Sequence, residues 1–119
     1  MFYTKILVVI LFTAFVFSAC FSSKAKGYSI IESKAYEASI FRQHCAICHG
    51  AEGEGKMTDQ GLRVPSLREG EFKFKTEEEI YHQIANGGNG MTPFHSQLTD
   101  NELHMMAAFV HDQLRRSEK

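Results

Sequence analysis

Two cysteines and a histidine stand together in the run Cys45-Ala46-Ile47-Cys48-His49. A Cys-x-x-Cys-His run is typical of covalent attachment of a c-type haem. Thiols three positions apart project from one face of a helix, where they can form thioethers with the two haem vinyl groups, and the adjacent imidazole then lies beneath the iron. The run therefore predicts one haem c held by Cys45 and Cys48, with His49 as an axial iron ligand.

Two other kinds of site use closely spaced cysteines. A structural zinc site needs four Cys or His ligands in a tetrahedron, and the third cysteine, Cys20, has a different expected role. A thioredoxin-like redox pair needs its cysteines at the head of a helix in a βαβ pattern, and no strand-rich segment accompanies them here. Haem attachment is therefore the favoured interpretation.

Residues 33–114 resemble a small single-haem class I cytochrome c, and the segment Cys45–Gly50 is similar to the opening motif of that family. The resemblance implies an all-α fold, in which three main helices wrap around one covalently bound haem c. It also implies an electron-transfer protein and not an enzyme. We accordingly assign residues 33–119 to a cytochrome c domain.

Three helices are expected from local signals. Apolar residues recur at spacings of three and four over residues 33–48, which predicts a helix with one apolar face. The two thiols lie at the C-terminal end of that face. The other two helices begin at Thr76 and Thr99, each followed three positions later by a glutamate that can complete a capping box. The glycines after Asn86 end the second helix, and the third continues to Leu114. No segment alternates clearly enough to predict a strand.

In class I cytochromes c the first and last helices cross through a small residue and an aromatic on one helix and an aromatic on the other. Ala38, Phe41 and Phe109 match those positions in this sequence. The family often has glycine where Ala38 stands, so a slightly wider crossing is expected.

The second axial ligand is sought among the methionines that would remain after processing. Met57 lies too near His49 in sequence to reach the opposite face of a haem. Met105 and Met106 lie within the expected last helix, where methionine commonly fills the core. Met91 remains as the candidate.

Met91 comes after the glycine-rich run 86–90, which lets the backbone approach a flat macrocycle closely, and Pro93 stiffens the chain just beyond Met91. Residues 91–94 also resemble the ligand loop of the family. A histidine and methionine pair would favour ferrous iron and a fairly positive potential. His95, four residues after Met91 in the same loop, is the alternative ligand.

The free ring nitrogen of His49 is expected to donate a hydrogen bond to a carbonyl, because such bonds fix the ring of a metal-bound histidine. The resemblance implies that Pro65 supplies this carbonyl, since residues 64–67 look like the corresponding segment of the family. A plain turn proline is the other interpretation.

The N-terminus has the pattern of an export signal over residues 1–19. Lys5 precedes an apolar stretch over residues 6–17, which is shorter than the roughly 20 residues of a spanning helix. Residues 17–20 resemble a bacterial lipobox, which implies that Cys20 becomes the first residue and carries a lipid. A free cysteine near an ordinary cleavage site is the alternative.

Residues 20–32 are mixed and polar, and we expect a lipid-anchored flexible tether there. The expected location is the periplasm or the outer side of the cell membrane. Loss of Lys5 leaves 12 basic against 14 acidic residues and a net charge of −2 in the mature chain. This balance argues against a nucleic-acid partner.

We therefore expect a monomeric, membrane-tethered one-electron carrier that meets redox proteins of a respiratory chain in transient contacts. Two alternatives remain open. One is a haem subunit of a larger respiratory complex. The other is a haem sensor or peroxidase-like protein with a labile sixth ligand, for which only His95 could serve as the distal acid or base.

Overall fold

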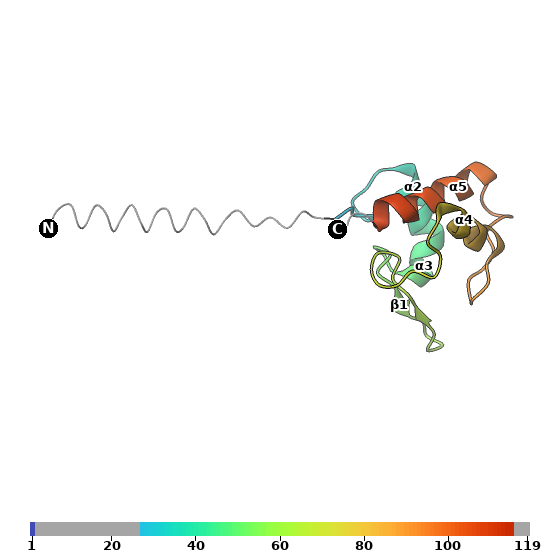
Figure 1. Ribbon diagram of the computed structural model, residues 1–119, viewed down its shortest axis with the longest axis horizontal. Coiled ribbons are helices and arrows are strands. Elements are labelled where there is room, and N and C mark those ends of the chain that lie inside the picture. The colour runs from blue at the N-terminus through green and yellow to red at the C-terminus, as the bar shows by residue number, and fades with distance from the viewer. Residues whose placement is uncertain (2–26, 116–119) are drawn as a thin grey trace.

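The computed structural model describes residue 1 and residues 27–115. Residues 2–26, which contain most of the predicted signal peptide and Cys20, lie outside the described residues. Figure 1 shows helices gathered around one core and a short hairpin that projects from them. In chain order the elements are α2 (Tyr36–Ile40), η1 (Phe41–Cys45), α3 (Ala46–His49), β1 (Lys56–Met57), β2 (Arg63–Val64), α4 (Glu77–Asn86), α5 (Asp100–Ala108) and η2 (Phe109–Leu114).

Three helical segments build the domain, which confirms the predicted all-α class. α2, η1 and α3 follow one another without a break from Tyr36 to His49, and η1 is wound as a π-helix. This run begins after Ser33, the predicted start, because Ala35 keeps an extended backbone with φ −62° and ψ 149°. α4 is the second segment, and α5 continues directly into the π-helical η2 as the third.

Both predicted capping boxes are present. The Thr76 side chain accepts from the Glu79 backbone N–H at 3.2 Å, and the Glu79 carboxylate accepts from the Thr76 N–H at 3.0 Å. Thr99 and Glu102 make the same pair of bonds at 3.3 and 2.8 Å. Each box satisfies N–H groups that the first turn of a helix leaves without partners. The starts of α4 and α5 are therefore fixed by local sequence.

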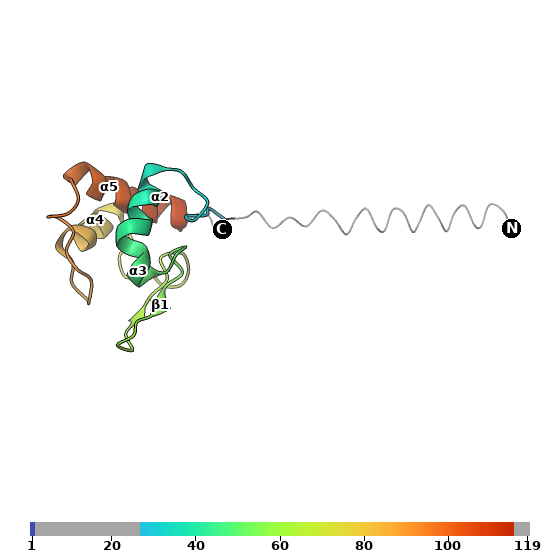
Figure 2. The same ribbon diagram turned by 180° about the vertical axis from the view of Figure 1, so that it is seen from behind.

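The first and last helical runs contact each other through the residues expected from the family. Ala38 is fully buried, and the Phe41 and Phe109 rings meet edge to face with centroids 6.2 Å apart. Tyr28 adds a second edge contact to Phe109 at 5.4 Å. Figures 1 and 2 show α2 beside α5 from opposite sides. The remaining buried apolar residues are Ile30, Ile40, Ile80, Ile84, Ala85, Leu98, Leu103, Met106, Ala107, Val110 and Leu114.

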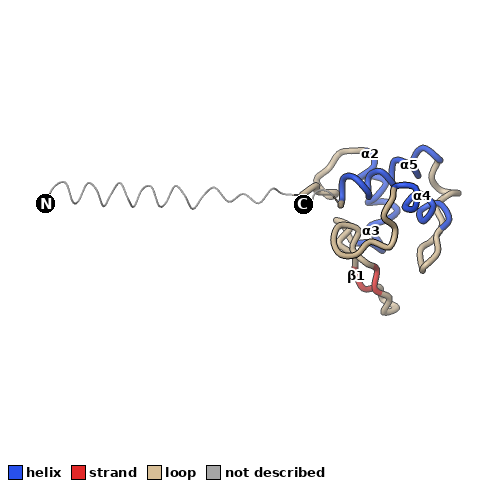
Figure 3. Tube along the Cα trace, in the orientation of Figure 1, coloured by secondary structure: helices blue, strands red, loops and turns tan. Residues whose placement is uncertain are grey.

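A small hairpin departs from the expectation that no strand would form. β1 and β2 pair antiparallel, with Lys56 opposite Val64 and Met57 opposite Arg63 (Figure 3). Its turn is closed by a bond from the Thr58 N–H to the Leu62 carbonyl at 2.8 Å. Strands of two residues leave no alternating pattern to read in the sequence.

The segment before the first helix also differs from prediction, because residues 27–32 of the expected tether pack against the domain. Ile30 is fully buried. The Glu52 carboxylate accepts hydrogen bonds from the Ser29 hydroxyl at 2.8 Å and from the Ile30 N–H at 2.7 Å. The partner lies more than 20 residues away in sequence, so composition alone gave no sign of this packing. The ordered domain therefore begins before Ser33.

Among the residues that the structure describes, no helix is both long enough and apolar enough to cross a membrane.

Candidate functional site

The two thiols of the Cys-x-x-Cys-His run lie on the last turns of the first helical run. Cys45 ends η1, Cys48 lies in α3, and neither forms a disulfide. Burial, with a smaller contribution from Cys48, raises the pKa of Cys45 to about 12. Reactive redox cysteines have lowered pKa values, so this thiol does not suit a thioredoxin-like pair. A thioether carries no charge, and its formation would remove the cost of burying an ionisable thiol.

The imidazole of His49 comes directly after Cys48 in α3. Burial lowers the pKa of His49, which favours the neutral ring that can bind a metal. Its Nδ1 atom is buried and has no hydrogen-bond partner within the described part of the chain. A buried polar nitrogen without a partner is costly. In metal-bound histidines, the nitrogen that does not touch the metal normally donates to a carbonyl, a carboxylate or water.

The loop after His49 lies close to the segment that contains Pro65. The Gly55 N–H donates to the His49 carbonyl at 2.7 Å. A Cβ atom on Gly55 would lie 2.6 Å from the Val64 carbonyl oxygen and 2.8 Å from the Pro65 carbonyl carbon. Only glycine fits this approach, and its φ of +79° also favours glycine. The structure thus brings Pro65 near the His49 loop, while the bond from His49 Nδ1 to the Pro65 carbonyl stays a prediction.

Met91 closes a two-residue hairpin turn. The Gly88 and Met91 backbones exchange hydrogen bonds of 2.9 and 3.0 Å. Asn89 and Gly90 between them have φ of +53° and +86°, and an Asn-Gly pair with positive φ at both positions is typical of a type I′ turn. The turn fixes the backbone of Met91, so its thioether projects from a defined place.

Gln83 was not predicted from the sequence as part of the site. Its side-chain Nε2 donates to Met91 Sδ at 3.7 Å and to the Gly88 carbonyl at 2.9 Å. A signal was available, because Ile80, Gln83 and Ile84 are spaced so that they share one face of α4. A polar residue on an otherwise apolar stripe indicates a polar partner below it.

The cysteine helix and the Met91 loop lie against the same core. The His44 and Phe94 rings, one from each, meet edge to face at 6.1 Å. Cys45 and Met91 both pack against the buried apolar cluster. The available donors are two free thiols, an imidazole and a thioether, and the imidazole has an unsatisfied buried nitrogen. These residues fit a covalently attached haem with histidine and methionine as axial ligands.

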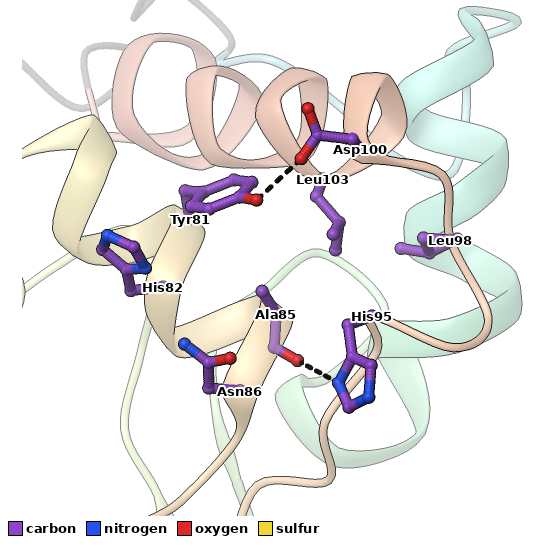
Figure 4. A pocket seen from close by; sticks show the side chains of 8 residues that line it. All are labelled: Tyr81, His82, Ala85, Asn86, His95, Leu98, Asp100 and Leu103. Carbon is purple, nitrogen blue, oxygen red and sulfur yellow. Dashed lines mark hydrogen bonds between the residues drawn. The ribbon is translucent and has the colours of Figure 1, made fainter.

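His95 lies in the loop after Met91, and its ring faces α4. Its Nδ1 atom is 3.0 Å from the Ala85 carbonyl oxygen (Figure 4). The ring lines a shallow depression to which none of Cys45, Cys48, His49 and Met91 contributes. The lining residues are Tyr81, His82, Ala85, Asn86, His95, Leu98, Asp100 and Leu103.

Comparison with known proteins gives a consistent result. Residues 35–110 match the protein family described as cytochrome C oxidase, cbb3-type, subunit III. The chain is 34% identical over 76 residues to cytochrome c6 of Parathermosynechococcus lividus and to that of Synechococcus elongatus, in each case covering 64% of this chain and 85% of the relative. It is 29% identical over 109 residues to cytochrome c6 of Gracilaria tenuistipitata var. liui, which covers 92% of this chain and 95% of the relative. No solved structure matches.

Proposed function

The chain belongs to the cytochrome c family, in the group described as cytochrome C oxidase, cbb3-type, subunit III, and we propose that it is a membrane-tethered one-electron carrier. Membership of this family means one covalently bound haem c and electron transfer in place of enzyme catalysis. The observation that carries the proposal is that the Cys45-x-x-Cys48-His49 helix and the Met91 loop pack on one shared core.

We assign the attachment of the haem to Cys45 and Cys48, and the two axial positions to His49 and Met91. When bound, the haem supplies a reversible one-electron couple at its iron. With the imidazole of His49 in one axial position and the thioether of Met91 in the other, the iron would have no coordination site left for a substrate. The thioether favours the ferrous state, and the carbonyl of Pro65 is the proposed acceptor for His49 Nδ1.

The lipid anchor at Cys20 is the second part of the proposal. Residues 20–26 can span at most about 25 Å when extended. A domain held within that distance of a membrane has a raised effective concentration beside membrane-bound partners. We therefore place the carrier on the periplasmic or outer side of the cell membrane, working as a monomer between redox proteins of a respiratory chain.

A haem subunit of a larger respiratory complex is a second candidate, and the description of the matching family favours it. The chemistry of the site would be the same, but the protein would not diffuse. Size-exclusion chromatography of gently solubilised membranes separates the two, because a free carrier elutes alone and a subunit elutes with its complex.

The test of the main proposal uses protein secreted by its native export route. We expect mass spectrometry to show one added haem per chain, and a redox titration to show a single one-electron step. The ferric spectrum should contain the charge-transfer band of a methionine-ligated iron, and the ferrous form should bind carbon monoxide slowly. Absence of the added haem would overturn the proposal.

The anchor is tested separately by fractionation. A variant in which residues 1–20 are replaced by a signal peptide that is cleaved without lipid attachment should move from the membrane fraction to the soluble fraction while it keeps its haem. The N-terminal peptide of the native protein should carry the mass of a lipid on Cys20. Retention of the variant with the exchanged signal peptide in the membrane would show that the tether is something else.

A further inference from the structure

The loop that carries Met91 begins and ends on the same turn of α4. The chain leaves this helix at Gly87 and returns where the Phe94 N–H donates to the Ile84 carbonyl at 3.0 Å. The His95 N–H donates to the next carbonyl, that of Ala85, at 3.2 Å. The last carbonyls of a helix lack partners within the helix. The backbone N–H groups of Phe94 and His95 supply these partners. They hold the two ends of the loop, here called its base, together on α4.

The ring of His95 adds a third bond to this base. Its Nδ1 atom lies 3.0 Å from the same Ala85 carbonyl oxygen, and Figure 4 shows the ring turned back toward α4. A carbonyl only accepts, so Nδ1 carries the hydrogen. A carbonyl oxygen has two lone pairs, and the backbone and ring N–H groups of His95 can use both.

The His95 ring and the Met91 sulfur face different parts of α4. His95 lines the depression between α4 and the start of α5, to which Asp100 also contributes. The Met91 sulfur instead contacts the side chain of Gln83, which is not among the lining residues of the depression.

We propose that His95 is a positioning residue for Met91, whose ring fastens the base of the Met91 loop to the Ala85 carbonyl and so holds the thioether in place. The inference rests on the proposed function, because it takes Met91 as an iron ligand. If the base opens, more residues of the loop move freely, and the Met91 side chain leaves its position more often.

The experiment compares His95→Ala and His95→Asn variants with a His82→Ala control, all as ferric holoprotein. His82 is an exposed histidine that lines the same depression and pairs with Glu78 at 3.0 Å, but it makes no bond to the loop. One readout is hydrogen exchange at the Phe94 amide, and the other is the rate at which added cyanide displaces the methionine thioether.

We expect His95→Ala to raise both rates about fivefold, the effect of one ordinary hydrogen bond. His95→Asn keeps a short side chain with an N–H donor and should restore part of the difference. The control should match the native protein. Circular dichroism shows whether each variant keeps its helices.

Unchanged rates in His95→Ala would overturn the proposal. Faster exchange with unchanged cyanide displacement would also overturn it, because His95 would then stabilise the loop without positioning Met91. A Met91→Ala variant that stays six-coordinate until His95 is also replaced would make His95 a ligand. Failure of the proposed function is distinct, since the native protein itself would then lack the methionine band.

Discussion

The side-chain amide of Gln83 donates to Met91 Sδ across 3.7 Å and to the Gly88 carbonyl at 2.9 Å. One side chain thus contacts the sulfur and the backbone turn that presents it. Sulfur is a weak acceptor, but a hydrogen bond to it draws electron density away from the metal. Gln83 should therefore tune the potential of the proposed iron site.

Replacing Gln83 by leucine should lower the reduction potential of the holoprotein by roughly 20–40 mV, since a net hydrogen bond of about 0.5–1 kcal/mol changes a one-electron couple by that amount. Potentiometric titration of the variant beside a Gln113→Leu control, altered at an exposed position, measures the effect. Equal potentials in both would show that the amide has no electronic influence on the sulfur.

Because of Glu52, the unfolding free energy of the domain should fall at acidic pH. Burial raises the pKa of Glu52, but the hydrogen bonds from Ile30, Ser29 and Ile31 and the charge of Arg68 outweigh it, so the net pKa is below its usual value. Its contribution to stability is therefore present above the pKa of an unfolded glutamate and is lost as pH falls through the lower folded value.

Urea unfolding at pH 7 and at successively lower pH checks this expectation. Glu52→Gln should flatten the acid side of the stability profile, whereas Glu69→Gln, at an exposed position, should leave the native profile unchanged. Parallel profiles for the native protein and Glu52→Gln would contradict the assignment.

Arg68 should be more important for stability than its position in a loop indicates. Its side chain is 9% exposed, pairs with Glu52 at 3.0 Å and also donates to the Tyr28 carbonyl at 2.7 Å. The Glu52 side chain is 31% exposed and would keep its hydrogen bonds from residues 29–31, so the loss of Arg68 should cost more than an exposed pair and less than a fully buried one. We expect Arg68→Met to cost about 2 kcal/mol of unfolding free energy, measured by urea denaturation. A loss below about 1 kcal/mol, the value of an exposed pair, would contradict this.

Two glycines with similar φ should respond differently to alanine. Gly55 has φ +79° and a Cβ there would meet backbone at 2.6 Å, whereas Gly61 has φ +77° and nothing within 4 Å. Gly61→Ala should cost only the backbone strain of about 1 kcal/mol. Gly55→Ala should cost about 1–3 kcal/mol more because the neighbouring segment must shift. Denaturation of both variants gives the comparison, and equal losses would refute the close approach.

The haem should also be needed for the fold. A domain of this size has a small core and commonly needs a cofactor to complete it. A Cys45→Ala, Cys48→Ala double variant should therefore lose most of its helical circular dichroism, while Cys20→Ala should keep it. Native helix content in the double variant would refute this.

Features that neighbouring residues determine could be predicted from the sequence, whereas contacts between residues far apart in the chain were missed. The helix starts at Thr76 and Thr99 were predicted correctly, because all residues of a capping box lie within four positions of the sequence. The Cys-x-x-Cys-His run was likewise readable from its spacing. Met91 was selected by elimination and by resemblance to the family, and its role as a ligand stays a prediction. The β1–β2 hairpin was missed because its strands are too short for a pattern.

The contacts of Glu52 and Gln83 were missed for another reason. Glu52 holds a segment more than 20 residues earlier in the chain, and Gln83 meets a sulfur eight residues later, beyond the end of its helix. Such contacts depend on how the chain folds back. The position of Gln83 on an apolar stripe of α4 indicates a polar partner, but it does not identify that partner.

The bonds from Glu52 and Arg68 to residues 28–31 also have a mechanical consequence. Glu52 stands three residues after His49, so a force applied through residues 28–31 reaches the domain close to the histidine that we propose as an iron ligand. The Tyr28 ring also contacts Phe109 of η2, so the same segment is joined to the last helical run. With the proposed lipid on Cys20, this attachment point would limit the directions in which the proposed haem side can face a partner.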